Sequence, residues 1–212
     1  MLICLEGLDA AGKATQSARL AERLRAILYS FPDYSTPMGH LIMGHLKGYW
    51  SAVPAGATDY TPKEASLQTL DAMVFQALQL ANRMEHALMM REHLVRGSHV
   101  VVDRYWPSGV VYGGADGLHE GYLRLLHAFL PQPDLFLLLK IDPTLSVARR
   151  PERRDRYEKQ AGLMEDVARR YDRLWAQAKD DPRWQVIDAA ESVEVVEESI
   201  WRLVQRRLEG IV

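Results

Sequence analysis

The stretch GLDAAGKAT at residues 7–15 constrains the chain most, and it directly follows the short apolar run LICLE. Its spacing is that of a phosphate-binding loop, in which four residues separate a glycine from a Gly-Lys pair. Gly7 and Gly12 let the backbone turn its N–H groups toward a phosphate, and the start of the following helix adds partial positive charge. Lys13 is expected to reach the terminal phosphates of a nucleotide. The residues predicted to bind these phosphates are Gly7, Ala10, Ala11, Gly12, Lys13, Ala14 and Thr15.

One position of this loop departs from the motif. Ala14 stands where a serine or threonine hydroxyl normally ligates Mg²⁺. A methyl group cannot bind a metal, and Thr15 lies about 100° further round the helix. Two outcomes are therefore open. Either a water takes the coordination place, since Mg²⁺ usually keeps several waters, or phosphoryl transfer is slow or lost.

Short apolar runs alternate with helical patterns along the whole chain. The candidate strands cover 2–6, 26–31, 99–103, 134–141 and 184–188. Several of them are continuously apolar, which is typical of strands buried on both faces of a parallel sheet. The helical patterns cover 12–27, 36–49, 63–97, 119–130, 143–150, 159–180 and 192–209. We predict an α/β fold of the P-loop NTPase type, in which helices flank a five-stranded parallel sheet within one domain, residues 1–212.

Composition excludes several classes of protein. A formal net charge of −2 leaves no general electrostatic footprint for nucleic acid. The single Cys4 excludes an internal disulfide and fits a reducing compartment. The apolar start meets Glu6 and Asp9 at once, so we expect no signal peptide, and no run approaches the roughly 18 apolar residues of a membrane span. We expect a cytoplasmic protein without nucleic-acid or membrane partners.

A second anchor follows the predicted strand 99–103, which ends in Asp103-Arg104. Residues at the carboxyl ends of strands face the ligand crevice in open α/β sheets. Asp103 is placed to hold Mg²⁺ through water, and Arg104 is placed to clamp a phosphate with both arms of its guanidinium.

Five segments, in this order, resemble the thymidylate kinase (dTMP kinase) family of P-loop nucleoside monophosphate kinases. They are EGLDAAGK, FPDYSTPMG, LANRME, DRYWPSGVVYGGA and RRPERRDRYEKQ. The resemblance covers nearly the whole chain and implies transfer of the γ-phosphoryl group of ATP to a deoxynucleoside monophosphate, dTMP above all, to give dTDP. Such an acceptor phosphate is already ionised, so no general base is required, and catalysis consists of positioning and charge neutralisation.

The resemblance also implies roles for individual residues. The segment at about 149–160 is expected to be a short arginine-rich lid, and the phosphate loop carries Ala10 where some family members carry an arginine. The catalytic residues so predicted are Lys13, Asp9, Arg104, Arg149 and Arg153, with Asp103 as the metal residue. The predicted acceptor-binding residues are Asp9, Tyr34, Phe75, Gln79, Arg83, Arg104, Ser108, Tyr112 and Tyr157. Arg83 and Arg104 would hold the acceptor phosphate, and Asp9 would lie near the 3′-hydroxyl of the acceptor sugar.

Three of the proposed acceptor positions depart from the family pattern. Gln79 stands where a phenylalanine usually stacks on thymine, Gly113 where a longer polar side chain often contacts the base, and Tyr34 where an arginine often touches the acceptor phosphate. Loss of base stacking costs about 1–3 kcal/mol if nothing compensates. Phe75 and Tyr112 could substitute in part, or Gln79 could hydrogen-bond a base edge.

These departures leave the acceptor base open. One alternative is a kinase for another or a modified-base deoxynucleoside monophosphate. Another is a nucleotide-binding regulator with little turnover, which Ala14 favours but Lys13, Asp103, Arg104 and the arginine lid oppose. The resemblance further implies a homodimer built from long helices, for which residues 63–97 are long enough.

Overall fold

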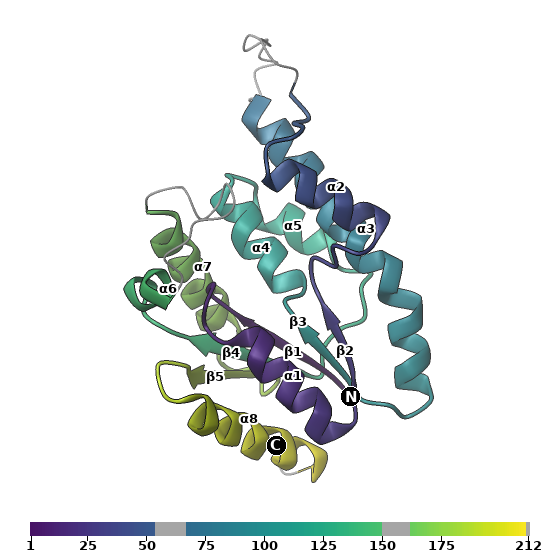
Figure 1. The fold of residues 1–212 in the computed structure, drawn as a ribbon, viewed down its shortest axis with the longest axis vertical. Coiled ribbons are helices and arrows are strands. Elements are labelled where there is room, and N and C mark those ends of the chain that lie inside the picture. Colours follow the sequence, from purple (N-terminus) through teal and green to yellow (C-terminus); the bar gives the residue numbers. More distant parts are fainter. Residues whose placement is uncertain (54–66, 150–161, 211–212) are drawn as a thin grey trace.

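The computed structural model describes residues 1–53, 67–149 and 162–210, and its centre is a five-stranded sheet (Figure 1). The strands are β1 (Leu2–Gly7), β2 (Ile27–Ser30), β3 (Val100–Asp103), β4 (Leu135–Lys140) and β5 (Trp184–Asp188). They follow the order β2-β3-β1-β4-β5, and every neighbouring pair is parallel. The predicted parallel α/β fold is therefore confirmed.

Burial differs between the central and the edge strands. All six residues of β1 are buried, as are the first five residues of β4. The edge strand β2 instead alternates partly buried and exposed residues, and Leu28 is 38% exposed. Continuous apolar runs thus mark burial on both faces only in the middle of the sheet, because an edge strand keeps one side accessible.

Eight helices occur within the described residues. They are α1 (Lys13–Leu24), α2 (Pro37–Leu46), α3 (Leu67–Val95), α4 (Trp106–Ala115), α5 (Glu120–Leu126), α6 (Pro143–Arg149), α7 (Leu163–Ala178) and α8 (Val193–Leu208). Helices α1 and α8 pack together on one face of the sheet, while α3, α4 and α7 lie on the other (Figure 1). Helix α2 packs along α3 beyond the sheet.

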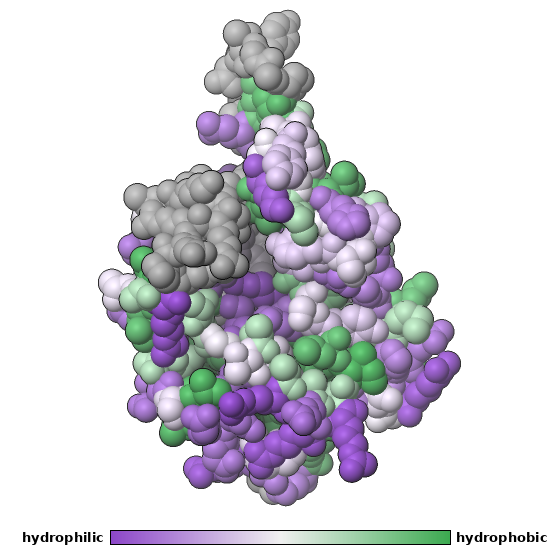
Figure 2. Space-filling view, viewed as in Figure 1, coloured by the Kyte–Doolittle hydropathy of each residue, from purple (hydrophilic) through white to green (hydrophobic). Residues whose placement is uncertain are grey.

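The outer surface of the α1–α8 layer is strongly polar. Hydrophilic side chains gather over these two helices in the lower part of Figure 2. Arg19 on α1 pairs with Glu197 on α8 at 2.6 Å. Arg23 lies over the ring of Trp201 at 4.1 Å. This layer therefore closes one side of the core with a solvated face.

Helix α4 is missing from the sequence prediction, which read residues 103–114 only as a motif. Its sequence, WPSGVVYGGA, combines glycines with β-branched valines, and both types have low helix propensity. Pro107 favours the first turn of a helix, however, and seven of the ten residues are buried. Tertiary packing therefore decides this helix, against its local propensity.

Candidate active site

The phosphate loop joins β1 to α1 with a backbone that depends on glycine. Gly7 has φ 140°, and a Cβ there would lie 2.3 Å from the carbonyl oxygen of Leu139. Gly12 has φ 88° and is the N-cap residue of α1, to which it brings no side chain. Ala10 also has positive φ, at 57°. The amides at the start of α1 are thus placed for an anion, as the sequence predicts.

Lys13 lies within the loop rather than in solvent. It is 6% exposed, and its Nζ donates to the carbonyl oxygen of Leu8 at 2.5 Å. Burial, followed by the charge of Arg104, lowers the pKa of Lys13 to about 8. The two residues after it, Ala14 and Thr15, are exposed. A bound phosphate would therefore give this lysine the counter-charge that the folded loop supplies only in part.

Asp103 ends β3 beside the loop. Its Oδ1 is buried without a hydrogen-bond partner among the described residues. Burial raises the pKa of this carboxyl group, while Lys13 and Arg104 lower it. No cluster of three metal-binding side chains occurs in the described part of the chain. The donor set fits a metal held by phosphate oxygens, waters and this one carboxylate, and it does not fit an all-protein cage.

Arg104 links the phosphate loop to α4. Its backbone φ is 63°, and its guanidinium contacts the carboxylate of Asp9. The same group lies 3.3 Å from Ser108 Oγ and 5.5 Å from the ring centre of Tyr112. Burial alone lowers its pKa, but Tyr112 and Asp9 outweigh burial and raise it. Arg104 is therefore a permanent cation beside the loop.

A cavity of about 460 Å³ opens next to this arginine. We call it the acceptor cavity. It is lined by Asp9, Ala14, Phe31, Pro32, Tyr34, Leu46, Phe75, Gln76, Gln79, Arg83, Asp103, Arg104, Ser108, Gly109 and Tyr112. The structure brings together every predicted acceptor-binding residue except Tyr157, which lies outside the described residues. Its volume suits a small polar ligand.

Arg83 enters this cavity from α3 and is 2% exposed. Its Nη1 donates to the carbonyl oxygen of Gln79 at 3.0 Å and lies 3.3 Å from Nε2 of His127. Burial lowers the pKa of Arg83 to about 10. Its Nε is buried without a hydrogen-bond partner among the described residues, so this guanidinium has donor capacity left for a ligand.

His127 was not expected as a site residue, because it belongs to the apolar end of a distant helix. It is 1% exposed, and its Nδ1 lies 2.8 Å from the carbonyl oxygen of Leu123. Burial and the charge of Arg83 lower its pKa to about 4. A neutral ring that donates from Nδ1 leaves Nε2 to accept from Arg83. His127 therefore positions that arginine.

Glu6 is the other unexpected residue, and it is fully buried at the end of β1. Its carboxylate accepts hydrogen bonds from the backbone N–H of Tyr105 at 2.7 Å and from the hydroxyl groups of Ser108 and Tyr171 at 2.7 and 2.8 Å. This network holds the start of α4, and with it Arg104. A carboxylate inside an otherwise apolar strand was the available sequence signal, since buried charges need partners.

The lid is described only at its first residue. Arg149 ends α6 and donates to the carbonyl oxygens of Ala189 and Ala190 at 3.0 and 3.1 Å. Arg153, the other predicted catalytic arginine, lies outside the described residues, as does the segment 150–160. Ala189 and Ala190 follow β5, so Arg149 ties the start of the lid segment to that loop.

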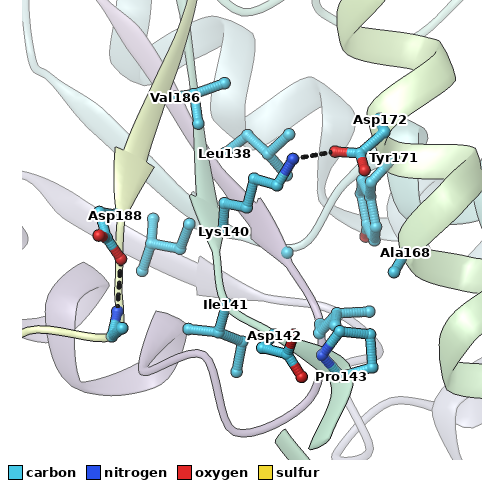
Figure 3. Close-up of a pocket in the computed structure, with 14 residues that line it drawn as sticks. Leu138, Lys140, Ile141, Asp142, Pro143, Ala168, Tyr171, Asp172, Val186 and Asp188 are labelled. Atoms are coloured by element: carbon cyan, nitrogen blue, oxygen red, sulfur yellow. Dashed lines mark hydrogen bonds and ion pairs between the residues drawn. The ribbon is translucent and has the colours of Figure 1, made fainter. Parts of the chain in front are cut away.

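A second cavity of about 510 Å³ lies where β4, β5 and α7 meet (Figure 3). Lys140 reaches across it to Asp172 at 2.6 Å, and Asp188 accepts from the backbone N–H of Ala190 at 2.9 Å. Asp142 caps the start of α6 through Thr144 at 2.8 Å. Since Lys140 is paired with Asp172 and the other charged groups named here are carboxylates, this cavity suits a phosphate less well than the acceptor cavity does.

A glycine-bearing loop between the first strand and the first helix, beside a cavity lined by charged side chains, defines a P-loop phosphotransferase. The family model described as thymidylate kinase matches residues 5–200. The human thymidylate kinase is 34% identical, over 94% of this chain and 87% of its own length. That of Thermomicrobium roseum is 36% identical, over 95% and 93%. The chain therefore belongs to the thymidylate kinase family.

The structural comparison agrees with this assignment. A solved thymidylate kinase from Candida albicans, described as having broad substrate specificity, superimposes with a TM-score of 0.79 at 25% identity, covering 97% of this chain and 91% of that chain. The predicted reaction, ATP-dependent phosphorylation of dTMP to dTDP by a nucleoside monophosphate kinase, is confirmed. Among the described residues, no helix has the length and apolar character needed to cross a membrane.

Proposed function

We propose that phosphoryl transfer to dTMP takes place between the phosphate loop and the acceptor cavity. The observation that carries this proposal is their shared wall, since Asp9 and Ala14 belong to the loop and also line the cavity. ATP phosphates on the loop amides and an acceptor phosphate near Arg104 would thus be neighbours. Holding the two reactants in this way supplies most of the catalysis that the reaction needs.

The chemistry requires no proton transfer from the acceptor. An oxygen of the ionised dTMP phosphate attacks the γ-phosphorus of ATP, and the bond from that phosphorus to the β–γ bridging oxygen breaks, which releases ADP. Lys13 neutralises charge on the donor phosphates, and Arg104 holds the acceptor phosphate, with Arg83 contributing from α3. Asp9, which contacts Arg104, is expected to lie near the 3′-hydroxyl of the acceptor sugar.

The metal of this reaction is proposed to be Mg²⁺. A bound Mg²⁺ would neutralise charge on the phosphate oxygens, and Asp103 is the residue that we expect to hold it, through water. The unpartnered Oδ1 of Asp103 supports this assignment. A water in place of the missing hydroxyl at Ala14 is compatible with the exposure of that residue.

The roles of the lid residues Arg149, Arg153 and Tyr157 stay predictions. In the structure Arg149 contacts backbone carbonyls after β5, so it would have to release Ala189 and Ala190 to reach the phosphates. The single-domain organisation of residues 1–212 is likewise proposed, and the one sheet that unites strands from both halves of the chain supports it.

Assembly and location belong to the same proposal. The long helix α3 exposes apolar side chains that a second copy could cover. They are Leu70, Val74, Met84, Leu88 and Met89. We propose a homodimer formed through this helix, which light scattering would test by molar mass. A cytoplasmic location is supported by the single, buried Cys4.

The direct test is a panel of nucleoside monophosphates incubated with ATP and Mg²⁺, with ADP as the readout. We expect ADP release that depends on dTMP. Turnover with another monophosphate but not with dTMP would change the acceptor assignment. Binding of ATP without ADP formation for any acceptor would leave a nucleotide-binding regulator, which no feature of the comparisons favours.

A further inference from the structure

A buried carboxamide in the acceptor cavity lacks a protein partner. Gln76 on α3 is 1% exposed and lines the cavity. Its Oε1 makes no hydrogen bond within the described residues. Leaving a buried polar atom unsatisfied costs free energy, so such an atom calls for an explanation. A ligand that enters the cavity with a hydrogen-bond donor would supply one.

Gln79 places a second carboxamide at the acceptor cavity, on the same face of α3 as Gln76. Residues three apart on a helix are neighbours, and Gln79 is 9% exposed and lines the same cavity. Its backbone carbonyl accepts from Arg83 at 3.0 Å, whereas its carboxamide takes part in no hydrogen bond found among the described residues. Two adjacent carboxamides therefore face the cavity with hydrogen-bonding capacity to spare.

The facing helix α4 makes room for Gln76 with glycines. A Cβ at Gly113 would lie 3.1 Å from Cδ of Gln76 and 2.7 Å from Cδ2 of Leu123. A Cβ at Gly109 would lie 2.7 Å from the ring of His127 and 3.5 Å from Oε1 of Gln76. Helix α4 therefore offers no side chain to Gln76 from these positions, and a larger residue would press on Gln76 at Gly113 and on His127 at Gly109.

The distribution of charge in the cavity indicates which way a nucleoside monophosphate would lie. Asp9, Asp103 and Arg104 carry charge at the part of the cavity next to the phosphate loop. The neighbours of Gln76 on α4 are Gly109 and Gly113, with neutral His127 behind them. Arg83 also lies at this end, with its Nη1 3.3 Å from Nε2 of His127. A nucleoside monophosphate whose phosphate meets Arg104 thus turns its base toward the carboxamides.

We propose that Gln76, assisted by Gln79, reads the hydrogen-bonding edge of the acceptor base. The Oε1 atom of Gln76 accepts from the ring N3–H of thymine, and a carboxamide N–H donates to the adjacent carbonyl oxygen of the ring. This pairing uses one donor and one acceptor on each partner, which the imide edge and a carboxamide both possess. The inference rests on the proposed function, because it names how that same site recognises its acceptor.

The test compares dTMP with dTMP methylated at ring nitrogen N3, on the wild type and on Gln76→Met. The substitution keeps about the same volume and removes both hydrogen-bonding groups. We expect the wild type to prefer dTMP over the methylated acceptor by about 10- to 100-fold in kcat/KM, because a site built around a hydrogen bond rejects a ligand that lacks it. Gln76→Met should lose most of that preference by turning over dTMP more slowly.

Three further readouts separate this role from a structural one. The thermal midpoint of ligand-free Gln76→Met should equal or exceed that of the wild type, because the substitution removes an unsatisfied buried oxygen. The KM for ATP should stay unchanged. The matched control, Gln68→Met at an exposed position of the same helix, should keep the full preference.

The inference is overturned if Gln76→Met slows both acceptors equally, or if it leaves the preference for dTMP intact. Calorimetric dissociation constants for dTMP and its methylated form give the same ratio without turnover. If the wild type binds dTMP more tightly than its methylated form but produces no ADP, only the proposed function is contradicted. Normal turnover with an unchanged ratio in the variant would contradict only the base-reading role.

Discussion

The phosphate loop and the acceptor cavity share a wall, but they are built by different means. The loop is one continuous stretch of nine residues, and its binding groups are backbone amides positioned by Gly7 and Gly12. The cavity takes side chains from the loop, from the segment after β2, from α2, α3 and α4, and from the tip of β3. The loop thus tolerates alanine at several positions, since an amide donor does not depend on its side chain, whereas the cavity depends on each side chain that lines it.

Support for the two regions differs in the same way. The loop needs a close approach of backbone to backbone, since a Cβ at Gly7 would meet Leu139 at 2.3 Å. The cavity needs buried polar contacts, such as Glu6 with Ser108 at 2.7 Å and Arg83 with His127 at 3.3 Å. Buried polar networks are costly when incomplete, so substitutions there should spread from one member to the next.

The largest effect should come from the one side chain on which the loop does depend. Lys13→Met removes the charge at the donor phosphates but leaves the amides in place, so we expect kcat to fall by about 10²- to 10³-fold. Steady-state ADP formation measures the loss. Lys179→Met, at an exposed site on the C-terminal side of α7, is the matched control and should retain full activity. Near-normal turnover in Lys13→Met would show that the loop depends on its backbone amides alone and not on this side chain.

The second prediction concerns the acceptor cavity, where His127 should make the free energy of unfolding depend on pH. The pKa of His127 is about 4 in the folded protein, below the ordinary value of about 6.5, so acid protonates the unfolded chain first. Its contribution to stability is complete above about pH 6.5 and is lost as pH falls toward 4, which amounts to about 2 kcal/mol between pH 7 and pH 5.

Replacing this histidine isolates its contribution. His127→Asn keeps a hydrogen-bond acceptor for Arg83 but does not titrate, so its free energy of unfolding should fall less between pH 7 and pH 5. Urea unfolding at the two pH values measures the difference. His40→Asn, at an exposed site, should reproduce the wild-type dependence. An unaltered pH dependence in His127→Asn would mean that the ring is not held neutral.

A third substitution addresses the wall between the two regions. Arg104→Lys keeps the charge but loses the planar group that reaches Asp9 and Ser108 together. We expect kcat/KM for dTMP to fall about tenfold, the scale of one charge-assisted hydrogen bond, while the KM for ATP changes little. Arg173→Lys on the exposed face of α7 serves as the control. Equal effects on both substrates would show that Arg104 serves the loop as much as the cavity.

The smallest expected effect concerns the metal. Ala14→Ser restores a hydroxyl at the start of α1, where a water would otherwise complete the coordination of Mg²⁺. Direct and water-mediated contacts differ little in energy, so the Mg²⁺ concentration for half-maximal activity should fall only about threefold. Titration of activity with Mg²⁺, with Ala18→Ser on the exposed side of the same helix as control, measures the shift. A gain of several orders of magnitude would show that the missing ligand limits the natural enzyme.

The extent of successful prediction follows the same division. All five strands and the phosphate loop were predictable, because continuous apolar runs and a fixed glycine spacing act within a few residues. Helix α4 was not, since its glycines and valines disfavour a helix that buried contacts nevertheless impose. Glu6, Gln76 and His127 were also missed. Their roles depend on partners up to 165 residues away, as in the contact from Glu6 to Tyr171.

The sequence by itself determined the family, the parallel sheet and the place of the phosphate loop, because each of these follows from local spacing and from the order of motifs. Only the tertiary structure decided which side chains meet in the acceptor cavity and which polar atoms are left there without a partner. The physical reason is that burial and hydrogen-bond satisfaction arise when helices from distant parts of the chain pack together. The proposed role of Gln76 in reading the base therefore depends on the packing of α4 against α3.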